Sequence, residues 1–233
     1  MKIVIIYNHK GGVAKTTTTI NTATFLSAYY DKKICIIDCD DYQWTTYEKY
    51  QGEKEKVLKS YNNDPEKILK AIEEKEIVDN DVEKCLMEDF DDKLLEIQNK
   101  NYDYVFVDLG NRTLKEAKAA FSKADQIVVP YSNDQDEINE ALKFYEAIEE
   151  VFPLVPIYCL VLKIEANRVS KHNKIKEILS ASNNIKYYDS IILKRQRYIE
   201  TKSFFYPLDY QTEYDDVKYG LISFTKELLE KTA

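Results

Sequence analysis

The sequence predicts an α/β protein in which a mainly parallel, twisted sheet carries helices on both faces. Short, continuous apolar runs recur along the chain and several end in carboxylates, as buried parallel strands do. Segments with helical spacing of apolar residues lie between these runs, and such alternation indicates parallel strands joined by right-handed crossovers. We expect one domain over residues 1–233, because a chain of 233 residues can bury a core of its own.

The first apolar run, residues 3–6, leads into a loop with two glycines and two lysines, and a helix expected to run to about Tyr30 follows. A strand that delivers such a loop onto a helix N-terminus binds phosphates, because the loop N–H groups and the helix dipole point at the anion. Lys15 is then expected to reach the β- and γ-phosphates, and the Thr16 hydroxyl to bind Mg²⁺. The expected nucleotide-binding residues are Lys10, Gly11, Gly12, Val13, Ala14, Lys15, Thr16 and Thr17.

The loop departs from the strict P-loop pattern G-x-x-x-x-G-K-[ST], since His9 and Ala14 occupy its two glycine positions. The variant K-G-G-x-x-K-[ST] is met in full. On these residues the loop resembles the deviant P-loop (deviant Walker A) of the ParA/MinD family of ATPases, closest to the small, ParF-like plasmid-partition proteins. The resemblance implies that Lys10 crosses a dimer interface to the phosphates of a second copy. Where the family usually has glycine, Ala14 disfavours a positive φ.

The second apolar run, residues 34–40, ends in Asp38 and Asp40. Ligands of open α/β sheets bind at the carboxyl ends of the strands, so these acids are expected to hold Mg²⁺ through water and to orient the attacking water. The family places Asp-x-Asp-Pro-Gln here, whereas this chain has Asp41 in place of the proline and Tyr42 before the glutamine. With the resemblance, we expect Asp38 at the metal and Asp40 as a catalytic residue together with Lys10 and Lys15.

Residues 44–100 are charged and helix-like, and Asp64-Pro65-Glu66 is a strong helix start. We assign this stretch no chemistry. The third run, residues 102–108, resembles a Walker B strand, and its Asp108 is expected to hold a metal-bound water and to steady Thr16. The remaining expected elements are helices at about 114–123, 136–151 and 167–180, and strands at 126–130, 157–162 and 185–193.

Residues 163–202 contain ten Lys or Arg against four acids, although the whole chain has a net charge of −8. The overall charge argues against a protein wrapped in nucleic acid, but a local basic patch fits phosphates. The densest part resembles the equivalent segment of small plasmid-partition ATPases. We therefore hypothesise non-specific DNA binding through this patch, with a plain solvated face as the alternative. The candidate DNA-binding residues are Lys194, Arg195, Arg197 and Lys202.

The four cysteines form no C-x-x-C pair, and three of them lie in apolar runs, which favours a reducing, cytoplasmic setting. The chain begins without a basic and apolar leader, and its apolar runs are too short to span a bilayer. We therefore expect a cytoplasmic protein without a membrane partner, associated with the nucleoid if the DNA hypothesis holds.

The resemblance implies a slow ATPase that converts ATP and water to ADP and phosphate, forms a homodimer around Mg²⁺ and ATP, and binds DNA until a separate, centromere-binding-type protein stimulates hydrolysis. Two other functions stay open. A membrane-surface positioning ATPase of the MinD branch needs a basic amphipathic C-terminal helix, but the charges of residues 223–231 are balanced. A metabolic synthetase or a relative of the nitrogenase iron protein needs a small-molecule substrate or paired thiolates, and the cysteines supply no evident pair.

Overall fold

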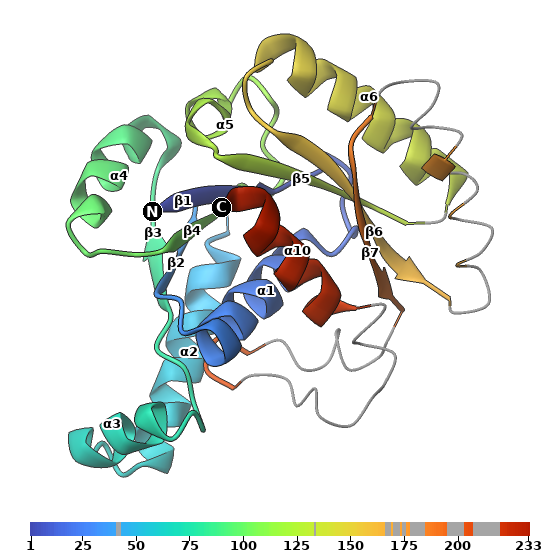
Figure 1. Ribbon diagram of the computed structural model, residues 1–233. Helices are drawn as coiled ribbons and strands as arrows, with labels where there is room; N and C mark the ends of the chain where they lie inside the picture. The colour runs from blue at the N-terminus through green and yellow to red at the C-terminus, as the bar shows by residue number, and fades with distance from the viewer. Residues whose placement is uncertain are drawn as a thin grey trace.

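The computed structural model describes residues 1–40, 43–132, 134–165, 185–194, 203–206 and 220–233, together with residues 169, 173, 176 and 177. Within this part of the chain, seven strands form one parallel sheet in the order β3-β2-β4-β1-β5-β6-β7 (Figure 1). The strands are β1 Lys2–Ile6, β2 Ile34–Asp38, β3 Asp81–Lys84, β4 Tyr104–Asp108, β5 Gln126–Tyr131, β6 Ile157–Ile164 and β7 Tyr187–Leu193. The predicted α/β class with a parallel sheet is confirmed.

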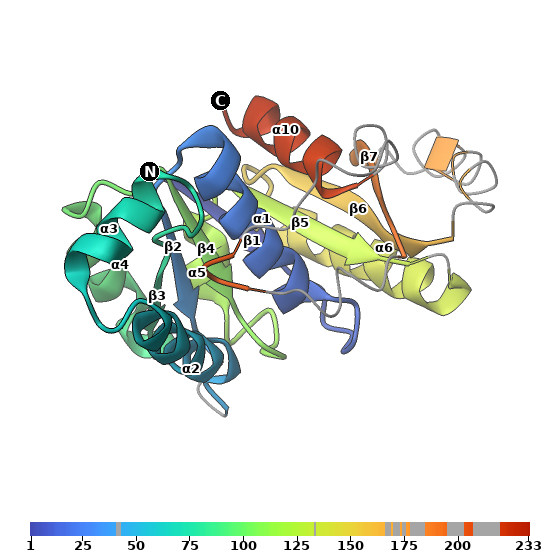
Figure 2. The same cartoon turned by 90° about the horizontal axis from the view of Figure 1, so that it is seen from below.

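Helices cover both faces of the sheet (Figures 1 and 2). They are α1 Lys15–Tyr30, α2 Thr45–Ser60, α3 Pro65–Glu73, α4 Phe90–Gln98, α5 Lys118–Lys123, α6 Gln135–Val151 and α10 Leu221–Thr232, with a short 3₁₀ helix, η1, at Met87–Asp89. The apolar side chains of α4, α5 and α6 share one buried cluster with one face of the sheet, whereas those of α1, α2 and α10 share the other. Among the described residues, no helix combines the length and apolar character that crossing a bilayer requires.

The strand order places the phosphate-binding candidates at one edge. Strand β1 lies between β4 and β5, and β4 lies between β1 and β2, so the ends of β1, β2 and β4 are neighbours. Asp38 and Asp108 are paired in register, which puts their carboxyl groups side by side. From β1 the chain continues to β2 on one side of β1, whereas β5 lies on its other side. Open α/β sheets bind ligands at the carboxyl ends of the strands where the order reverses in this way.

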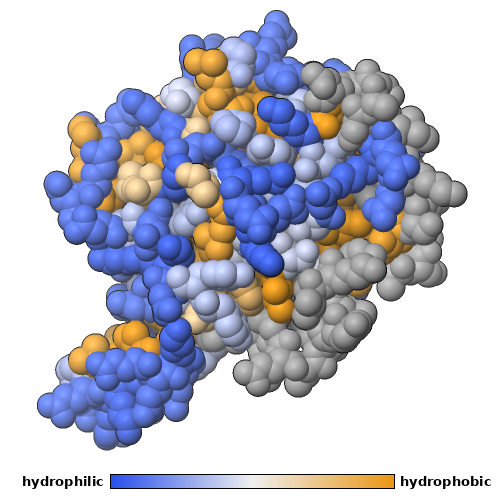
Figure 3. Space-filling view, viewed as in Figure 1, coloured by the Kyte–Doolittle hydropathy of each residue, from blue (hydrophilic) through white to orange (hydrophobic). Residues whose placement is uncertain are grey.

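Helices α2 and α3 form a projection that leaves the body of the molecule at the lower left of Figure 1. The predicted helix start at Asp64 is confirmed, since its carboxylate accepts the N–H groups of Glu66 and Lys67 and Pro65 occupies the first turn. In the space-filling view this projection is mostly hydrophilic (Figure 3). Leu69 is an exception, because 58% of its surface is exposed.

The structure corrects two expected elements. Strand β3 lies inside the stretch expected to be helical. Its residues Asp81-Val82-Glu83-Lys84 bury only Val82, so the apolar pattern of a strand is absent. Helix α5 begins at Lys118 rather than near residue 114. The helix expected at 167–180 falls on a segment of which only positions 169, 173, 176 and 177 are described. The other expected helices and strands agree within a few residues.

Candidate nucleotide-binding site

The loop between β1 and α1 has the open backbone that an anion requires. Gly12 has a φ of 77° and Ala14 a φ of 65°. A side chain added at Gly11 or Gly12 would meet no described heavy atom within 4 Å, so the loop presents its backbone to open space. Ala14 thus adopts the positive φ that its side chain disfavours, at a cost of about 1 kcal/mol relative to glycine.

Lys15 points into the loop that precedes it. Its Nζ donates to the carbonyl oxygen of Asn8 at 2.7 Å, to that of Lys10 at 3.2 Å and to Oδ1 of Asn111 at 3.2 Å. Only 9% of Lys15 is exposed, and burial lowers the pKa of its ammonium, although the Asp108 and Asp40 carboxylates raise it. The ammonium is therefore held among acceptors inside the loop, where a phosphate oxygen would be its natural partner.

The structure brings Thr16 and Asp108 together, as the sequence predicts. The Thr16 hydroxyl donates to Oδ2 of Asp108 at 2.8 Å, and the backbone N–H of Gly110 donates to Oδ1. A second hydroxyl, that of Thr46 in the first turn of α2, donates to the same Oδ2 at 2.8 Å. A hydroxyl beside a carboxylate supplies the hard oxygen donors that Mg²⁺ prefers, so these residues fit such an ion.

Asp38 lies beside Asp108 but accepts hydrogen bonds from a different kind of donor. Its side chain is fully buried and accepts three backbone N–H groups, those of Asp40, Thr46 and Tyr47. Burial raises the pKa of the Asp38 carboxyl to about 6, despite these hydrogen bonds and together with the nearby Asp108 and Asp40 charges. The structure thus places Asp38 at the N-terminus of α2, where a negative charge is favourable. Its role at a metal stays a prediction.

Asp40 packs against Gly110. A Cβ added at Gly110, whose φ is 59°, would lie 2.5 Å from Cγ of Asp40. The backbone oxygen of Asp40 accepts the N–H groups of Gln43 and Trp44, which turns the chain toward α2. Asp41 and Tyr42, where the chain departs from the family pattern, lie outside the described residues. The structure therefore fixes where Asp40 lies, while its catalytic role stays a prediction.

The rim of the loop contacts α6. Nζ of Lys10 lies 3.8 Å from a carboxylate oxygen of Glu137, and Nε2 of His9 lies 2.9 Å from one of Glu140. Lys10 and Lys15 therefore point to different sides of the same loop. The Lys10 side chain is 36% exposed, and its neighbour Lys15 is buried.

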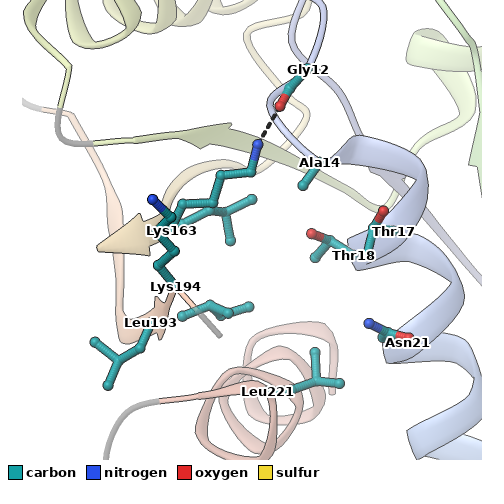
Figure 4. A pocket seen from close by; sticks show the side chains of 11 residues that line it. Gly12, Ala14, Thr17, Thr18, Asn21, Lys163, Leu193, Lys194 and Leu221 are labelled. Carbon is teal, nitrogen blue, oxygen red and sulfur yellow. Dashed lines mark hydrogen bonds between the residues drawn. The ribbon is translucent and has the colours of Figure 1, made fainter. Parts of the chain in front are cut away.

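A cavity of about 270 Å³ adjoins the loop on the side of β6 and β7 (Figure 4). Thr17, Thr18 and Asn21 line it from α1, and Leu221 lines it from α10. Lys163, at the end of β6, extends over the cavity, and its ammonium donates to the carbonyl oxygen of Gly12. The cavity has apolar walls with a few polar groups, as sites for small ligands do, and it adjoins the predicted phosphate-binding loop.

The predicted DNA-binding patch is described only in part. Lys194 is exposed and lines the cavity, whereas Arg195, Arg197 and Lys202 lie outside the described residues. Two other lysines of the basic stretch make contacts within the chain. Lys163 binds the loop, and Lys176 lies 3.0 Å from a carboxylate oxygen of Asp189.

Several residues of the site were not predicted. Buried Asn8 donates from Nδ2 to the Pro130 oxygen at 2.9 Å and accepts the Lys10 N–H through Oδ1, so it ties the loop to β5. Thr46 and Asn111 reach the site from α2 and from the turn after β4. No local pattern in the sequence marks these polar residues, since each meets the loop or its carboxylates only through the fold.

Comparisons with known proteins support the fold. A family model described as an AAA domain matches residues 1–88. No curated protein matches the chain. Among solved structures, a putative plasmid partition protein from Borrelia burgdorferi B31 bound to AMPPNP superposes with a TM-score of 0.64 at 22% identity, over 99% of this chain and 98% of that one. MinD from Aquifex aeolicus gives a TM-score of 0.67 at 22% identity over the same shares. The chain has the ParA/MinD P-loop fold.

The ParA/MinD fold also includes a ParA solved with DNA. The structure of pNOB8 ParA bound to nonspecific DNA superposes with a TM-score of 0.57 at 19% identity, over 99% of this chain and 98% of that one. The predicted resemblance to ParA and MinD is therefore confirmed at the level of the fold. Both branches are among the similar structures, so the fold leaves the choice between them to the site and surface of this chain.

Proposed function

We propose that this protein is an ATP-dependent dimerising ATPase of the DNA-partition (ParA) type. One observation carries the proposal: a single loop has a buried lysine, Lys15, whose ammonium lies inside the loop, and a partly exposed lysine, Lys10, whose ammonium lies on the side of α6. The first serves the phosphates of the protein's own nucleotide. The second would leave its contact with Glu137 and reach the phosphates of another copy, as a nucleotide sandwiched in a dimer requires.

Residues in and beside the loop between β1 and α1 suit Mg²⁺ and a nucleotide. Thr16 and Asp108 would hold the ion, directly and through water, and Mg²⁺ would neutralise charge that develops on the phosphates. The cavity beside Thr17 is lined by Gly12 and Ala14 of the loop itself and offers apolar walls to a nucleoside. The similar Borrelia protein was solved with AMPPNP, which supports an adenine nucleotide here.

Hydrolysis would use three groups of the chain. Lys15 steadies the transferred phosphoryl group, Asp40 positions the water, and Lys10 of a second copy adds positive charge in the transition state. Hydrolysis would then separate the copies. We expect the basal rate to be slow and a separate, centromere-binding-type protein to stimulate it, so that ATP is used for a change of state.

Non-specific DNA is the proposed partner of the ATP-bound dimer, in a cytoplasmic protein that associates with the nucleoid. The DNA complex of pNOB8 ParA and the excess of basic residues over 163–202 support this. Lys194 is exposed at the end of β7, as a phosphate contact requires. Arg195→Glu combined with Arg197→Glu should abolish duplex binding in the presence of ATP, and rising salt should weaken binding of the parent. Unchanged binding by this variant would refute the patch.

The decisive experiment measures the molecular mass in solution with ADP, with ATP and with ATP plus duplex DNA, for the parent and for Lys10→Ala. The parent should be a monomer with ADP and a dimer with ATP. Lys10→Ala should bind ATP but fail to dimerise or to hydrolyse it. A parent without affinity for adenine nucleotides, or a Lys10→Ala protein that dimerises and hydrolyses normally, would refute the proposal.

The MinD-like alternative depends on a free amphipathic helix, and α10 is not free. Its apolar residues Leu221, Phe224 and Leu228 are buried in the cluster that α1 and β7 share. Glu227 accepts the backbone N–H groups of Asp189 and Ser190 in β7, which fixes the helix further. ATP-dependent binding to anionic liposomes that is lost on removal of the last ten or so residues would favour the MinD-like function instead. Stimulation of the ATPase by a small metabolite rather than DNA would favour a synthetase.

A further inference from the structure

Two acidic side chains of α6 contact His9 and Lys10, two consecutive residues of the loop between β1 and α1. Glu137 pairs with Lys10 at 3.8 Å, and Glu140, one turn later, pairs with His9 at 2.9 Å. The spacing of three residues puts both carboxylates on one face of the helix, so they meet consecutive residues of the loop. The His9 ring also lies against Phe144, with centroids 5.7 Å apart. These contacts join loop and helix across more than 120 residues of sequence.

The carboxylates belong to a rigid element. Helix α6 begins at a cap in which Asp134 accepts the N–H groups of Asp136 and Glu137, and its residues Ile138 and Ala141 are buried against the sheet. Glu137 is fixed further, because its second oxygen accepts the N–H of Ser132. Since the helix cannot follow the loop outward, movement of Lys10 away from its own chain breaks the contact.

We propose that Glu137 and Glu140 form a clamp that holds Lys10 against its own chain and must open before Lys10 reaches the phosphates of a second copy. This inference rests on the proposed function, in which Lys10 acts across a dimer. The same ammonium cannot pair with Glu137 and contact a distant phosphate. The clamp stabilises the monomer, so it raises the concentration at which ATP produces the dimer.

A triphosphate can open the clamp where a diphosphate cannot. The γ-phosphate offers Lys10 a more highly charged partner than one carboxylate, and ADP lacks it. Each exposed ion pair shifts an equilibrium by only a small factor, from about one- to fivefold. Movement of Lys10 breaks its pair with Glu137 in each copy, so two pairs break in a dimer and the clamp is expected to weaken dimerisation about fivefold in total.

The test compares Glu137→Gln/Glu140→Gln with the parent at increasing protein concentration and saturating ATP. Glutamine keeps an acceptor for the Ser132 N–H and removes the charge. The variant should dimerise at about fivefold lower concentration, and both proteins should remain monomers with ADP. The matched control is Asp136→Asn/Glu146→Gln, which removes two charges from the same helix at residues without an ion pair to any described residue. A control that shifts as much as the variant would overturn the clamp in favour of a general charge effect.

A second measurement needs neither ATP nor a dimer. In the nucleotide-free monomer, the rate at which an amine-acylating reagent modifies Lys10 is measured by mass spectrometry of the peptide that contains it. Release from the clamp should raise this rate about two- to threefold in Glu137→Gln, but not in Asp136→Asn. Equal rates in parent and variant overturn the clamp, even if ATP-dependent dimerisation is found. A raised rate in a protein that fails to bind ATP supports the clamp and refutes the proposed function alone.

Discussion

Strands β2 and β4 both end in an aspartate, and the two carboxyl groups lie side by side at the same edge of the sheet. Asp38 accepts three N–H groups, all from the segment that follows its own strand. Asp108 instead accepts the hydroxyls of Thr16 and Thr46, which belong to different helices. The same local pattern thus starts a helix at one strand end and joins two helices at the other. The difference indicates that Asp38 organises the start of α2, whereas Asp108 joins α1 and α2 at the predicted metal site.

The largest expected effect separates these two functions directly. Asp108→Asn should lower the rate of ATP hydrolysis at saturating Mg²⁺ by at least about a hundredfold. The substitution removes the negative charge that would attract the metal and that orients the Thr16 hydroxyl. Phosphate release measures the rate. Asp38→Asn should lower it less, through disorder of the α2 N-terminus. A larger loss in Asp38→Asn than in Asp108→Asn would reverse the assignment.

The second prediction concerns the residues two positions beyond each aspartate, Asp40 and Gly110. Gly110→Ala should lower the free energy of unfolding by about 3 kcal/mol, because alanine is strained at a φ of 59° and its Cβ would collide with the Asp40 carboxyl group. Urea unfolding measures the change. Gly52→Ala in α2 is the control, since a Cβ there meets no described atom within 4 Å and alanine favours the helix. If Gly110→Ala is as stable as the parent, the packing of Asp40 against Gly110 is wrong.

The third prediction concerns the contribution of Asp38 to the pH dependence of the free energy of unfolding. Its pKa is about 6 in the folded protein and near 4 in the unfolded chain. Between these values the folded state binds more protons, so the free energy of unfolding falls as the pH rises from about 4 to 6, and the contribution is constant above that. The expected fall is about 2 to 3 kcal/mol. Urea unfolding at each pH, as the difference between the parent and Asp38→Asn, should show it. Parallel curves over this range would contradict the raised pKa.

The smallest expected effect tests the hydroxyl that joins α2 to Asp108. Thr46→Val keeps the shape of the side chain and removes its hydrogen bond to a charged acceptor, so the free energy of unfolding should fall by about 1.5 kcal/mol. Thr46→Ser should retain most of the parent's stability. If Thr46→Val is as stable as Thr46→Ser, the hydroxyl does not hold α2 to the site, and the contrast between the two carboxylates is weaker than the structure indicates.

Much of the fold and the core of the site could be predicted from the sequence, because their signals are local. Apolar runs mark β1, β2 and β4 since these strands are buried on both faces. The spacing of Lys15 and Thr16 marks the loop. Strand β3 could not be predicted, since four residues with one buried side chain carry no period. At an edge of the sheet, such charged residues protect against pairing with another chain.

The remaining site residues depend on contacts that the sequence does not display. Asn8 meets Pro130 across 122 positions, Thr46 meets Asp108 across 62, and Lys163 meets Gly12 across 151. Each is a polar residue of a common type, and only the strand order brings it to the loop. The predicted nucleotide-binding loop is therefore readable from one segment, whereas the residues that position its groups are not.

Trp44 is the only tryptophan of the chain, and its place next to Asp40 has a practical consequence. Its backbone N–H is bonded to the Asp40 oxygen at 2.7 Å, and the Lys84 ammonium lies 5.4 Å from the centre of its ring. Any ligand that shifts the Asp40 backbone will move the indole relative to that cation. The emission spectrum of the unlabelled protein should then change, which gives the molecule its own optical signal for occupancy of the loop.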